Sequence, residues 1–300
     1  MEAFYRTHRY LVEHTDAPIR RGLMDEIDWE DRLIAIKGTR GVGKTTFLLQ
    51  YAKERFGTDR SCLYLNMNNL YFVQHRLVDF AEKFVNDGGQ VLLIDQMFKY
   101  DDWSHELREC YERFPSLKIV FTGSSVMRLK EENPELGDIV KIYYLRGLSF
   151  REFLNLQSGN SFRAYTLDEI LFQPDGLCAE VNAKCRPLAY FDDYLKVGYY
   201  PFRLEGNEDY YTRIENVVNM ILEIELPQQC GIDVGNIRKL KTLLTILSSE
   251  VPLMVDMTKL SALSEMSRTT LLAYLQYLHR AKLIHLLYSD LDSLKKLQKR

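Results

Sequence analysis

The chain has 300 residues, of which 46% are hydrophobic and 27% charged, a composition typical of a globular protein with a sizeable core. No apolar run approaches the ~18 residues that a membrane-spanning helix requires. The N-terminal stretch MEAFYRTHRYLVEHTD also lacks the apolar core of a secretory signal. These features argue against a membrane or secreted protein, so we expect a cytoplasmic location without membrane contact.

The formal net charge of −3 is unevenly distributed. Residues 236–300 carry 11 basic and 5 acidic side chains, a net charge of +6, and the rest of the chain carries −9. A basic terminal segment permits contact with nucleic acid, although a solvated basic face is at least as common. The five cysteines and six histidines form no CxxC or HExxH pair, so we expect reduced thiols and no structural metal.

After a helical lead-in over residues 1–30, short apolar segments alternate with amphipathic ones. The pattern predicts strands at Leu33–Lys37, Cys62–Asn66, Val91–Asp95, Lys118–Gly123 and Ile142–Leu145, and helices at Thr46–Phe56 and Asp102–Phe114. The third predicted strand, VLLID, is apolar up to its final residue, as expected of a strand buried on both faces of a parallel sheet. Alternating strands and helices predict an α/β fold with right-handed crossovers.

After about residue 165 the segments become aromatic-rich and helical, which predicts a helical lid. The last part of the chain has a different order of elements. It consists of amphipathic segments at Ile237–Leu247, Met257–Ser264 and Arg268–Lys282, then an apolar run at Leu283–Tyr288. Ser267 can cap the third segment, and the apolar run is typical of a strand. Three helices followed by a strand predict a winged helix.

The clearest motif lies between the first predicted strand and the helix after it. Residues Gly38-Thr39-Arg40-Gly41-Val42-Gly43-Lys44-Thr45-Thr46 match the phosphate-loop pattern G-x-x-x-x-G-K-[ST]. Glycines let backbone N–H groups approach phosphate oxygens, and a helix start directs its positive dipole end at the anion. Lys44 can reach the β- and γ-phosphates, and the Thr45 hydroxyl can ligate Mg²⁺. The motif predicts that these nine residues bind ATP with Mg²⁺.

Asp95 and Gln96 follow the third predicted strand and are candidates for the chemistry. A carboxylate at a strand end beside the loop can hold Mg²⁺ through water, whereas helix capping is the alternative interpretation of Asp95. ATPases of this layout usually carry a glutamate at the place of Gln96. An amide can orient water but cannot accept its proton. We therefore predict good ATP binding and slow hydrolysis.

Together these residues resemble bacterial and archaeal AAA-superfamily ATPases in which the AAA domain precedes a C-terminal nuclease-like domain of unknown function. The similar blocks are DEIDWEDRLIAIKGTRGVGKTT, LLIDQMFKYDDWSHELRECYE, FTGSS, LRGLSFREFL, RPLAYFDDYLKVGYYPF and LSEMSRTTLLAYLQYLHRAKLI. The resemblance implies an AAA-type α/β domain at residues 1–165, a helical lid at 166–235 and a winged helix at 236–300. It also implies that Ser124 is the polar sensor of the γ-phosphate, with helix capping as the alternative.

The chain departs from this family pattern in three places. Family members typically show Asp-Glu-Ile-His where this chain has Asp95-Gln96-Met97-Phe98. Their paired arginines, suited to act on a neighbour's ATP, have no counterpart in Leu136-Gly137-Asp138-Ile139, which leaves Arg128 and Arg146 as candidate fingers or surface charges. The sequence ends at Arg300 after one predicted wing strand, so we expect a truncated product or a shortened relative.

Three functions compete. The chain is expected to be a nucleotide-dependent switch, an active ATPase that uses Gln96, or an ATP-binding regulator that contacts duplex DNA. For the third, Arg268, Thr269 and Thr270 open the presumed recognition helix, where base contacts are usually made, although this helix can also serve only for packing. A small-molecule kinase is the least supported hypothesis. The expected partners are ATP and, as open alternatives, DNA, a protein partner or a second copy of the chain.

Overall fold

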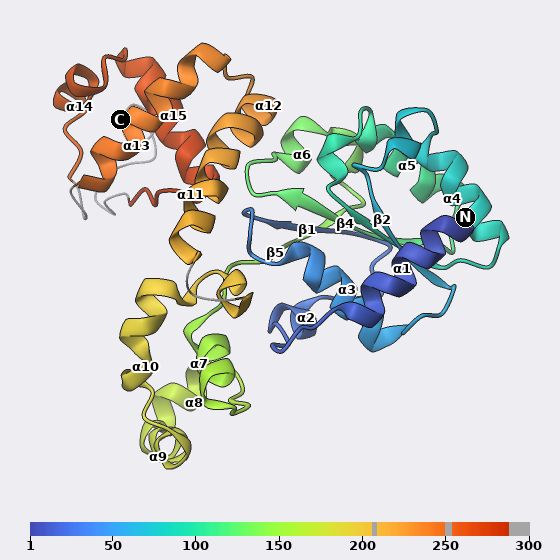
Figure 1. Ribbon diagram of the computed structural model, residues 1–300, viewed down its shortest axis with the longest axis horizontal. Coiled ribbons are helices and arrows are strands. Elements are labelled where there is room, and N and C mark those ends of the chain that lie inside the picture. Colours follow the sequence, from blue (N-terminus) through green and yellow to red (C-terminus); the bar gives the residue numbers. More distant parts are fainter. Residues whose placement is uncertain (206–208, 250–253, 288–300) are drawn as a thin grey trace. The chain divides into compact units, whose positions relative to one another are not determined.

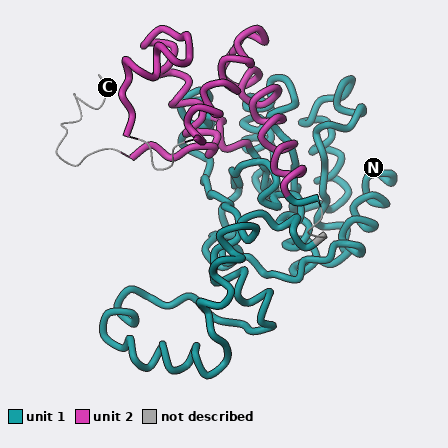
Figure 2. Tube along the Cα trace, turned by 60° about the vertical axis from the view of Figure 1, so that its left-hand side comes forward, with its two compact units in different colours: residues 1–123, 128–210 teal, residues 124–127, 211–300 magenta. Residues whose placement is uncertain are grey.

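The computed structural model describes residues 1–205, 209–249 and 254–287 (Figure 1). The chain divides into two compact units. Unit 1 comprises Met1–Gly123 and Arg128–Tyr210, and unit 2 comprises Ser124–Met127 and Tyr211–Arg300. Figure 2 shows the two units in teal and magenta. The chain therefore passes from one unit to the other several times along its length.

Unit 1 contains a five-stranded parallel sheet with the strand order β2-β3-β4-β1-β5. The strands are β1 (Leu33–Gly38), β2 (Cys62–Asn66), β3 (Val91–Asp95), β4 (Lys118–Ser124) and β5 (Lys141–Tyr144). All five predicted strands and the α/β class are confirmed. In the pairing of β3 with β4, Ile94 stands beside Phe121, so the ends of these strands meet at one edge. The phosphate-loop motif leaves β1 at the same edge, because all the strands run in one direction.

Helices cover both faces of this sheet. The helices of this part are α1 (Glu2–His14), α2 (Leu23–Glu26), α3 (Lys44–Arg55), α4 (Leu77–Asn86), α5 (Trp103–Arg113) and α6 (Leu129–Glu132). Figure 1 shows α1 and α3 on one face and α4 and α5 on the other. The predicted helices after the phosphate loop and after β3 are confirmed as α3 and α5. Helix α3 buries Phe47, Leu48 and Ala52 in the core beside β1, which fixes its start at the end of that strand.

The remaining helices of unit 1 follow the sheet in sequence. They are α7 (Phe150–Ser158), α8 (Leu167–Phe172), α9 (Pro174–Lys184) and α10 (Leu188–Asp193). Helix α7 begins with a capping box in which Ser149 and Glu152 exchange hydrogen bonds, and Thr166 and Glu169 do the same for α8. After α10 the chain forms a π-helical turn at Tyr194–Gly198 and a 3-10 turn at Pro201–Glu205.

Unit 2 is helical in its described residues. Its helices are α11 (Tyr210–Met220), α12 (Leu226–Cys230), α13 (Ile237–Ser249), α14 (Met257–Ser264) and α15 (Arg268–Arg280). Leucines from α13, α14 and α15 share one apolar core, which explains why these amphipathic segments fold together. The three helices predicted here are confirmed. So is the Ser267 cap, whose side chain accepts a hydrogen bond from the Thr270 amide.

The predicted strand at Leu283–Tyr288 is wrong over Leu283–Leu287, and Tyr288 lies outside the described residues. The amides of Leu283 and Ile284 both donate to the carbonyl of Leu278, which closes the end of α15. The Leu286 amide donates to Nδ1 of His279. Because these amides are bonded locally, they are not available for pairing with a strand. The winged helix therefore remains a prediction.

Candidate functional site

The phosphate-loop residues form a tight turn between β1 and α3. Gly41 and Gly43 have φ values of 84° and 92°, in the left-handed region where glycine has no steric penalty. Gly38 is required for another reason, because a Cβ atom there would lie 2.4 Å from the carbonyl oxygen of Leu145. Helix α3 begins at Lys44, directly after Gly43, so its positive dipole end adjoins the loop.

Two polar side chains of this loop suit an anionic ligand. The Lys44 ammonium donates to the carbonyl oxygens of Gly38 and Thr39, at 2.8 and 2.9 Å, and so lies across the loop. The Thr39 hydroxyl is buried, and no hydrogen-bond partner for it exists among the residues that the structure describes. A buried hydroxyl without a partner costs about 1–3 kcal/mol. A phosphate oxygen could satisfy it, so the loop fits the group that its sequence predicts.

Asp95, at the end of β3, is 2% exposed and accepts four hydrogen bonds. Its Oδ2 accepts from the Thr45 hydroxyl at 2.6 Å and from the Tyr64 hydroxyl at 2.9 Å. Its Oδ1 accepts from the Thr122 hydroxyl at 2.5 Å and from the backbone N–H of Gln96 at 3.0 Å. An ionised carboxylate has about four lone-pair sites, so the carboxylate is fully hydrogen-bonded and fixed in orientation.

The donors around Asp95 come from separate elements and are hydroxyls or a backbone amide. Thr45 belongs to α3, Tyr64 to β2 and Thr122 to β4, so the carboxylate ties three elements to β3. Burial raises the pKa of Tyr64, and the charge of Asp95 raises it further, so Tyr64 remains a neutral donor. Neutral donors orient a carboxylate without cancelling its charge. The pair of Thr45 and Asp95 therefore suits a divalent cation next to the loop.

Gln96 has left-handed backbone geometry, with a φ of 57°. This conformation is uncommon for residues other than glycine and often marks functional sites. The backbone N–H of Gln96 donates to Asp95 and also to the Thr122 hydroxyl, at 3.0 Å in each case. The side chain is partly buried at the edge of the sheet where the loop lies. The structure thus brings Gln96 next to Asp95, and its role toward water stays a prediction.

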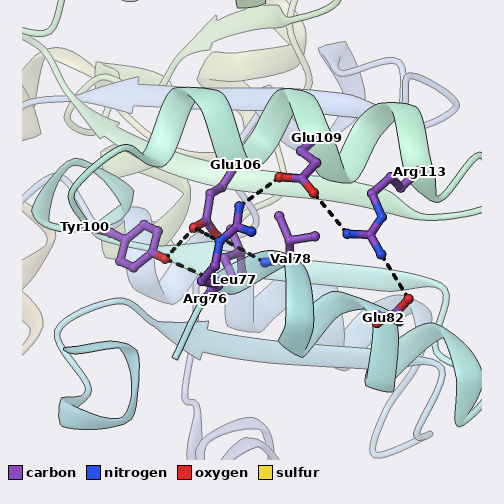
Figure 3. A network of polar contacts seen from close by, with 8 residues as sticks. All are labelled: Arg76, Leu77, Val78, Glu82, Tyr100, Glu106, Glu109 and Arg113. Atoms are coloured by element: carbon purple, nitrogen blue, oxygen red, sulfur yellow. Dashed lines mark hydrogen bonds and ion pairs between the residues drawn. The ribbon is translucent and has the colours of Figure 1, made fainter. Parts of the chain in front are cut away.

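The segment after Gln96 is anchored to α4 and α5 by a second buried carboxylate, that of Glu106 (Figure 3). Glu106 accepts from the Arg76 guanidinium, the Tyr100 hydroxyl and the Val78 amide, at 3.0, 2.9 and 3.1 Å. Burial, followed by the bond to Glu106, raises the pKa of Tyr100 to about 12, so its hydroxyl stays protonated. The short turn between Asp95 and α5 is therefore held at both ends.

The chain after α10 also lies against the phosphate loop. A Cβ atom on Gly43 would be 3.6 Å from Cγ of Pro201. The Leu148 amide donates to the Tyr199 carbonyl at 2.7 Å, and a Cβ on Gly147 would lie 2.5 Å from the same oxygen. Residues 199–201 thus pack on both the phosphate loop and the loop after β5. We call them the strap.

Comparison with known proteins agrees with this geometry. Residues 30–154 match the family model described as an AAA domain. Residues 188–299 match a domain of unknown function, DUF8612, whose match includes the strap. None of the curated proteins matches the chain. No helix in the described residues is long and apolar enough to cross a membrane.

Several solved structures resemble the chain loosely. They include AMPPCP-bound DnaA from Aquifex aeolicus, with 12% identity, coverage of 94% of this chain and 89% of that chain, and a TM-score of 0.30. A DNA replication initiation factor shows 14% identity, 94% and 90% coverage, and a TM-score of 0.31. The S. cerevisiae Hsp104–ADP complex shows 16% identity, 86% and 50% coverage, and a TM-score of 0.36. Likenesses of this strength carry no functional conclusion.

Ser124 is the last residue of β4 and directly follows the buried Thr122 and Gly123. Its hydroxyl donates to Oε2 of Glu225 at 2.7 Å and accepts from the Val126 amide at 3.3 Å. These partners all belong to unit 2. The alternative interpretation as a helix cap is wrong, because α6 begins only at Leu129. The role of Ser124 as a γ-phosphate sensor stays a prediction.

The residues predicted to contact DNA open α15 of unit 2. Arg268 and Thr269 are exposed, whereas Thr270 is partly buried and its amide and hydroxyl both contact Ser267. The arginine and the first threonine are thus accessible, and the second threonine serves the cap. Contact of these residues with DNA remains a prediction.

Sequence reasoning missed four polar residues of unit 1: Tyr64, Thr122, Arg21 and Glu152. A signal for the first two was present. Tyr64 and Thr122 lie near the carboxyl ends of predicted strands, and in a parallel sheet those ends meet at the ligand-binding edge. Arg21 and Glu152 are 131 residues apart, and neither sits in a motif that would relate it to the other.

Proposed function

We propose that this chain is an ATP-binding AAA-type protein that acts as a nucleotide-dependent switch, with slow or absent hydrolysis. The observation that carries the proposal is the 2.6 Å hydrogen bond between the Thr45 hydroxyl of the phosphate loop and the buried carboxylate of Asp95. Thr45 and Asp95 are suited to hold Mg²⁺. The Lys44 ammonium and the loop amides are suited to bind the phosphates, and the Thr39 hydroxyl to donate to a phosphate oxygen. Bound Mg²⁺ would supply charge neutralisation on the phosphate oxygens.

Slow hydrolysis follows from the residue beside Asp95. The backbone N–H of Gln96 is hydrogen-bonded to Asp95 and Thr122, so the position of its Cα beside Asp95 is fixed. A glutamine there can orient a water molecule but cannot remove its proton, so the general-base contribution is lost. Arg128 and Arg146 are both exposed, and we infer that neither acts as a finger within an isolated chain.

Two continuous chain segments support the proposal that nucleotide state reaches unit 2. The first runs from Thr122, which contacts Asp95, through Gly123 to Ser124, whose hydroxyl is bonded to Glu225 in unit 2. The second begins at the strap, where Pro201 packs near Gly43, and continues along the chain to unit 2 at Tyr211. A shift of the loop or of Asp95 on binding would therefore act on the covalent connections between the units.

The proposal is tested by measuring ATP binding and turnover side by side on the purified chain. Titration calorimetry with Mg²⁺ measures binding, and phosphate release measures turnover. We expect tight binding with little turnover, loss of binding in Lys44→Ala, and a gain of turnover in Gln96→Glu. Ready turnover with Gln96 in place would instead indicate the active ATPase, and no binding by the unaltered chain would refute the proposal.

Contact with duplex DNA is the second candidate, favoured by the exposed Arg268 at the capped start of α15 and by the basic charge of residues 236–300. A mobility shift that weakens with salt and with Arg268→Ala would support it. Lys259→Ala is the matched control, because Lys259 is an exposed basic residue on the neighbouring helix α14. No shift at low salt would exclude this candidate.

A further inference from the structure

Arg21 is buried in the lead-in before β1, with 8% of its surface exposed. Its guanidinium donates to four acceptors from three regions of the sequence. These are Oε1 of Glu152 at 3.1 Å and the carbonyl oxygens of Val42, Arg146 and Gly147, at 3.1, 2.6 and 3.0 Å. One charged side chain thus connects the phosphate loop, the loop after β5 and the first turn of α7. Buried arginines are retained where such fixed, planar geometry is needed.

The partner carboxylate is held as firmly as the arginine. Oε1 of Glu152 also accepts from the Gly22 amide at 2.9 Å, and Oε2 accepts from the amide and hydroxyl of Ser149, at 2.8 and 3.0 Å. Burial by itself would raise the pKa of Glu152, but Arg21 and these donors together hold it below its ordinary value. The pair is therefore charged, and the guanidinium has little freedom to reorient.

The contact with Val42 links this pair to the ligand-binding loop. Val42 lies between Gly41 and Gly43, whose left-handed geometry sets the course of the loop, and its side chain is fully buried. The peptide bond between Val42 and Gly43 is planar, so the Val42 carbonyl and the Gly43 N–H point in opposite directions. A guanidinium that holds the carbonyl toward the interior turns the Gly43 N–H away from it.

We propose that Arg21 is a positioning residue for nucleotide binding, which orients the Val42–Gly43 peptide so that the Gly43 N–H is presented to a phosphate oxygen. The inference rests on the proposed function, since it requires ATP at this loop. It assigns to the lead-in a part in ligand binding beyond packing. Glu152 supports this role indirectly, by fixing the guanidinium that in turn fixes the loop.

Arg21→Lys separates charge from geometry. Lysine keeps the positive charge beside Glu152, but a single ammonium cannot reproduce the planar fork that reaches both Glu152 and Val42. Because a hydrogen bond from a charged group is lost at the loop, we expect ATP affinity to fall on the order of 10-fold while the thermal midpoint changes by only a few degrees. Arg20→Lys is the matched control, because the neighbouring Arg20 is exposed and pairs with Asp25 and Glu54.

A second variant covers the case in which Arg21→Lys does not fold. Arg21→Met combined with Glu152→Gln removes both charges, and glutamine retains the capping box and an acceptor for the Gly22 amide. We expect this double variant to fold, to bind ATP more weakly than the unaltered chain, and to show a smaller ATP-induced downfield shift of the Gly43 amide in the NMR spectrum.

Unchanged affinity and an unchanged Gly43 amide shift in a folded variant would overturn the inference, since a merely structural pair affects only stability. That result is distinct from failure of the proposed function, in which the unaltered chain itself binds no ATP and both proposals fall. Weaker binding in the Arg21 variants, with Arg20→Lys binding normally, supports the positioning role.

Discussion

Asp95 and Glu152 are both buried carboxylates of unit 1 that accept four hydrogen bonds, but they differ in the kind of donor. Asp95 accepts from three hydroxyls and one amide, whereas Glu152 accepts from a guanidinium, one hydroxyl and two amides. Neutral donors hold a carboxylate in place and leave its charge to act on a ligand. The Arg21 guanidinium neutralises the charge of Glu152. The same number of hydrogen bonds therefore forms an ion pair that holds the structure together, which we call a structural tie.

Glu106 stands between these two cases. It is buried like the others and contacts the Arg76 guanidinium, but that side chain is 51% exposed (Figure 3). Solvent screens an ion pair with such an exposed partner, so its net contribution is small. The Tyr100 hydroxyl and the Val78 amide then account for most of the specificity of this contact. The comparison predicts that variants at the three carboxylates affect different properties, which can be measured separately.

The largest effect is expected from Arg21→Met. It leaves the Glu152 carboxylate buried without its cation, and breaking a buried pair on one side costs about 3–5 kcal/mol. Urea unfolding followed by tryptophan fluorescence measures this loss, because both tryptophans of the chain, Trp29 and Trp103, lie in unit 1. Adding Glu152→Gln should recover most of the stability. A single variant as stable as the unaltered chain would mean that the pair is not a structural tie.

The next effect is expected from Asp95→Asn, on ligand binding rather than on folding. Hydroxyls can rotate to accept from an amide, so the surroundings of Asp95 adapt to asparagine and stability falls by only about 1 kcal/mol. The gain in ATP affinity that Mg²⁺ provides should disappear, since the charge that suits the cation is gone. Calorimetry with and without Mg²⁺ measures it. Glu106→Gln is the matched control, because Glu106 is a buried carboxylate whose cation, Arg76, is half exposed, and it should keep its response to Mg²⁺. An unchanged response in Asp95→Asn would refute the assignment.

The features that were predictable from the sequence depend on local patterns. Five strands, the phosphate loop and the helices α3, α5 and α13–α15 follow from hydrophobic periodicity, glycine placement and a cap such as Ser267. The pairing of Thr45 with Asp95 was also predictable, because the loop and the end of β3 must share one edge of a parallel sheet. Such inferences need only the order of elements along the chain.

The features that were missed depend on contacts between distant segments. Arg21 meets Glu152 across 131 residues, and without the fold an arginine in a charged lead-in is indistinguishable from a surface charge. The strand predicted at Leu283–Tyr288 is wrong over its described residues, Leu283–Leu287, for a related reason. An apolar run becomes a strand only if a partner strand is present, and in Leu283 and Ile284 the amides turn back to Leu278 instead.

A smaller effect is expected from Tyr64→Phe, which removes one of the four donors to Asp95. We expect a loss of about 1 kcal/mol in stability, and weaker discrimination between ATP with and without Mg²⁺ because the carboxylate gains freedom to rotate. Unfolding by urea and calorimetry with Mg²⁺ measure the two effects. Tyr5→Phe is the matched control, since Tyr5 is also buried and its hydroxyl also donates, but to the Arg60 carbonyl away from this site. Equal results for both tyrosines would show that Tyr64 acts only in packing.

The smallest effect is expected in the pH dependence of unit 1. The pKa of Glu152 is lowered in the folded state, so its contribution to stability is complete above its unfolded value of about 4.5 and is lost as the pH falls through the folded value. We expect the unaltered chain to lose less than about 1 kcal/mol more than Arg21→Met/Glu152→Gln between pH 6 and pH 4. The difference between the two proteins is the informative quantity, because the partly exposed carboxylates of Glu109 and Glu169 also have lowered pKa values and are common to both. If the two proteins lose stability in parallel, Glu152 is not held charged by Arg21. The contrast with Asp95, in which donor type rather than donor number sets the role of a buried carboxylate, would then lose its basis.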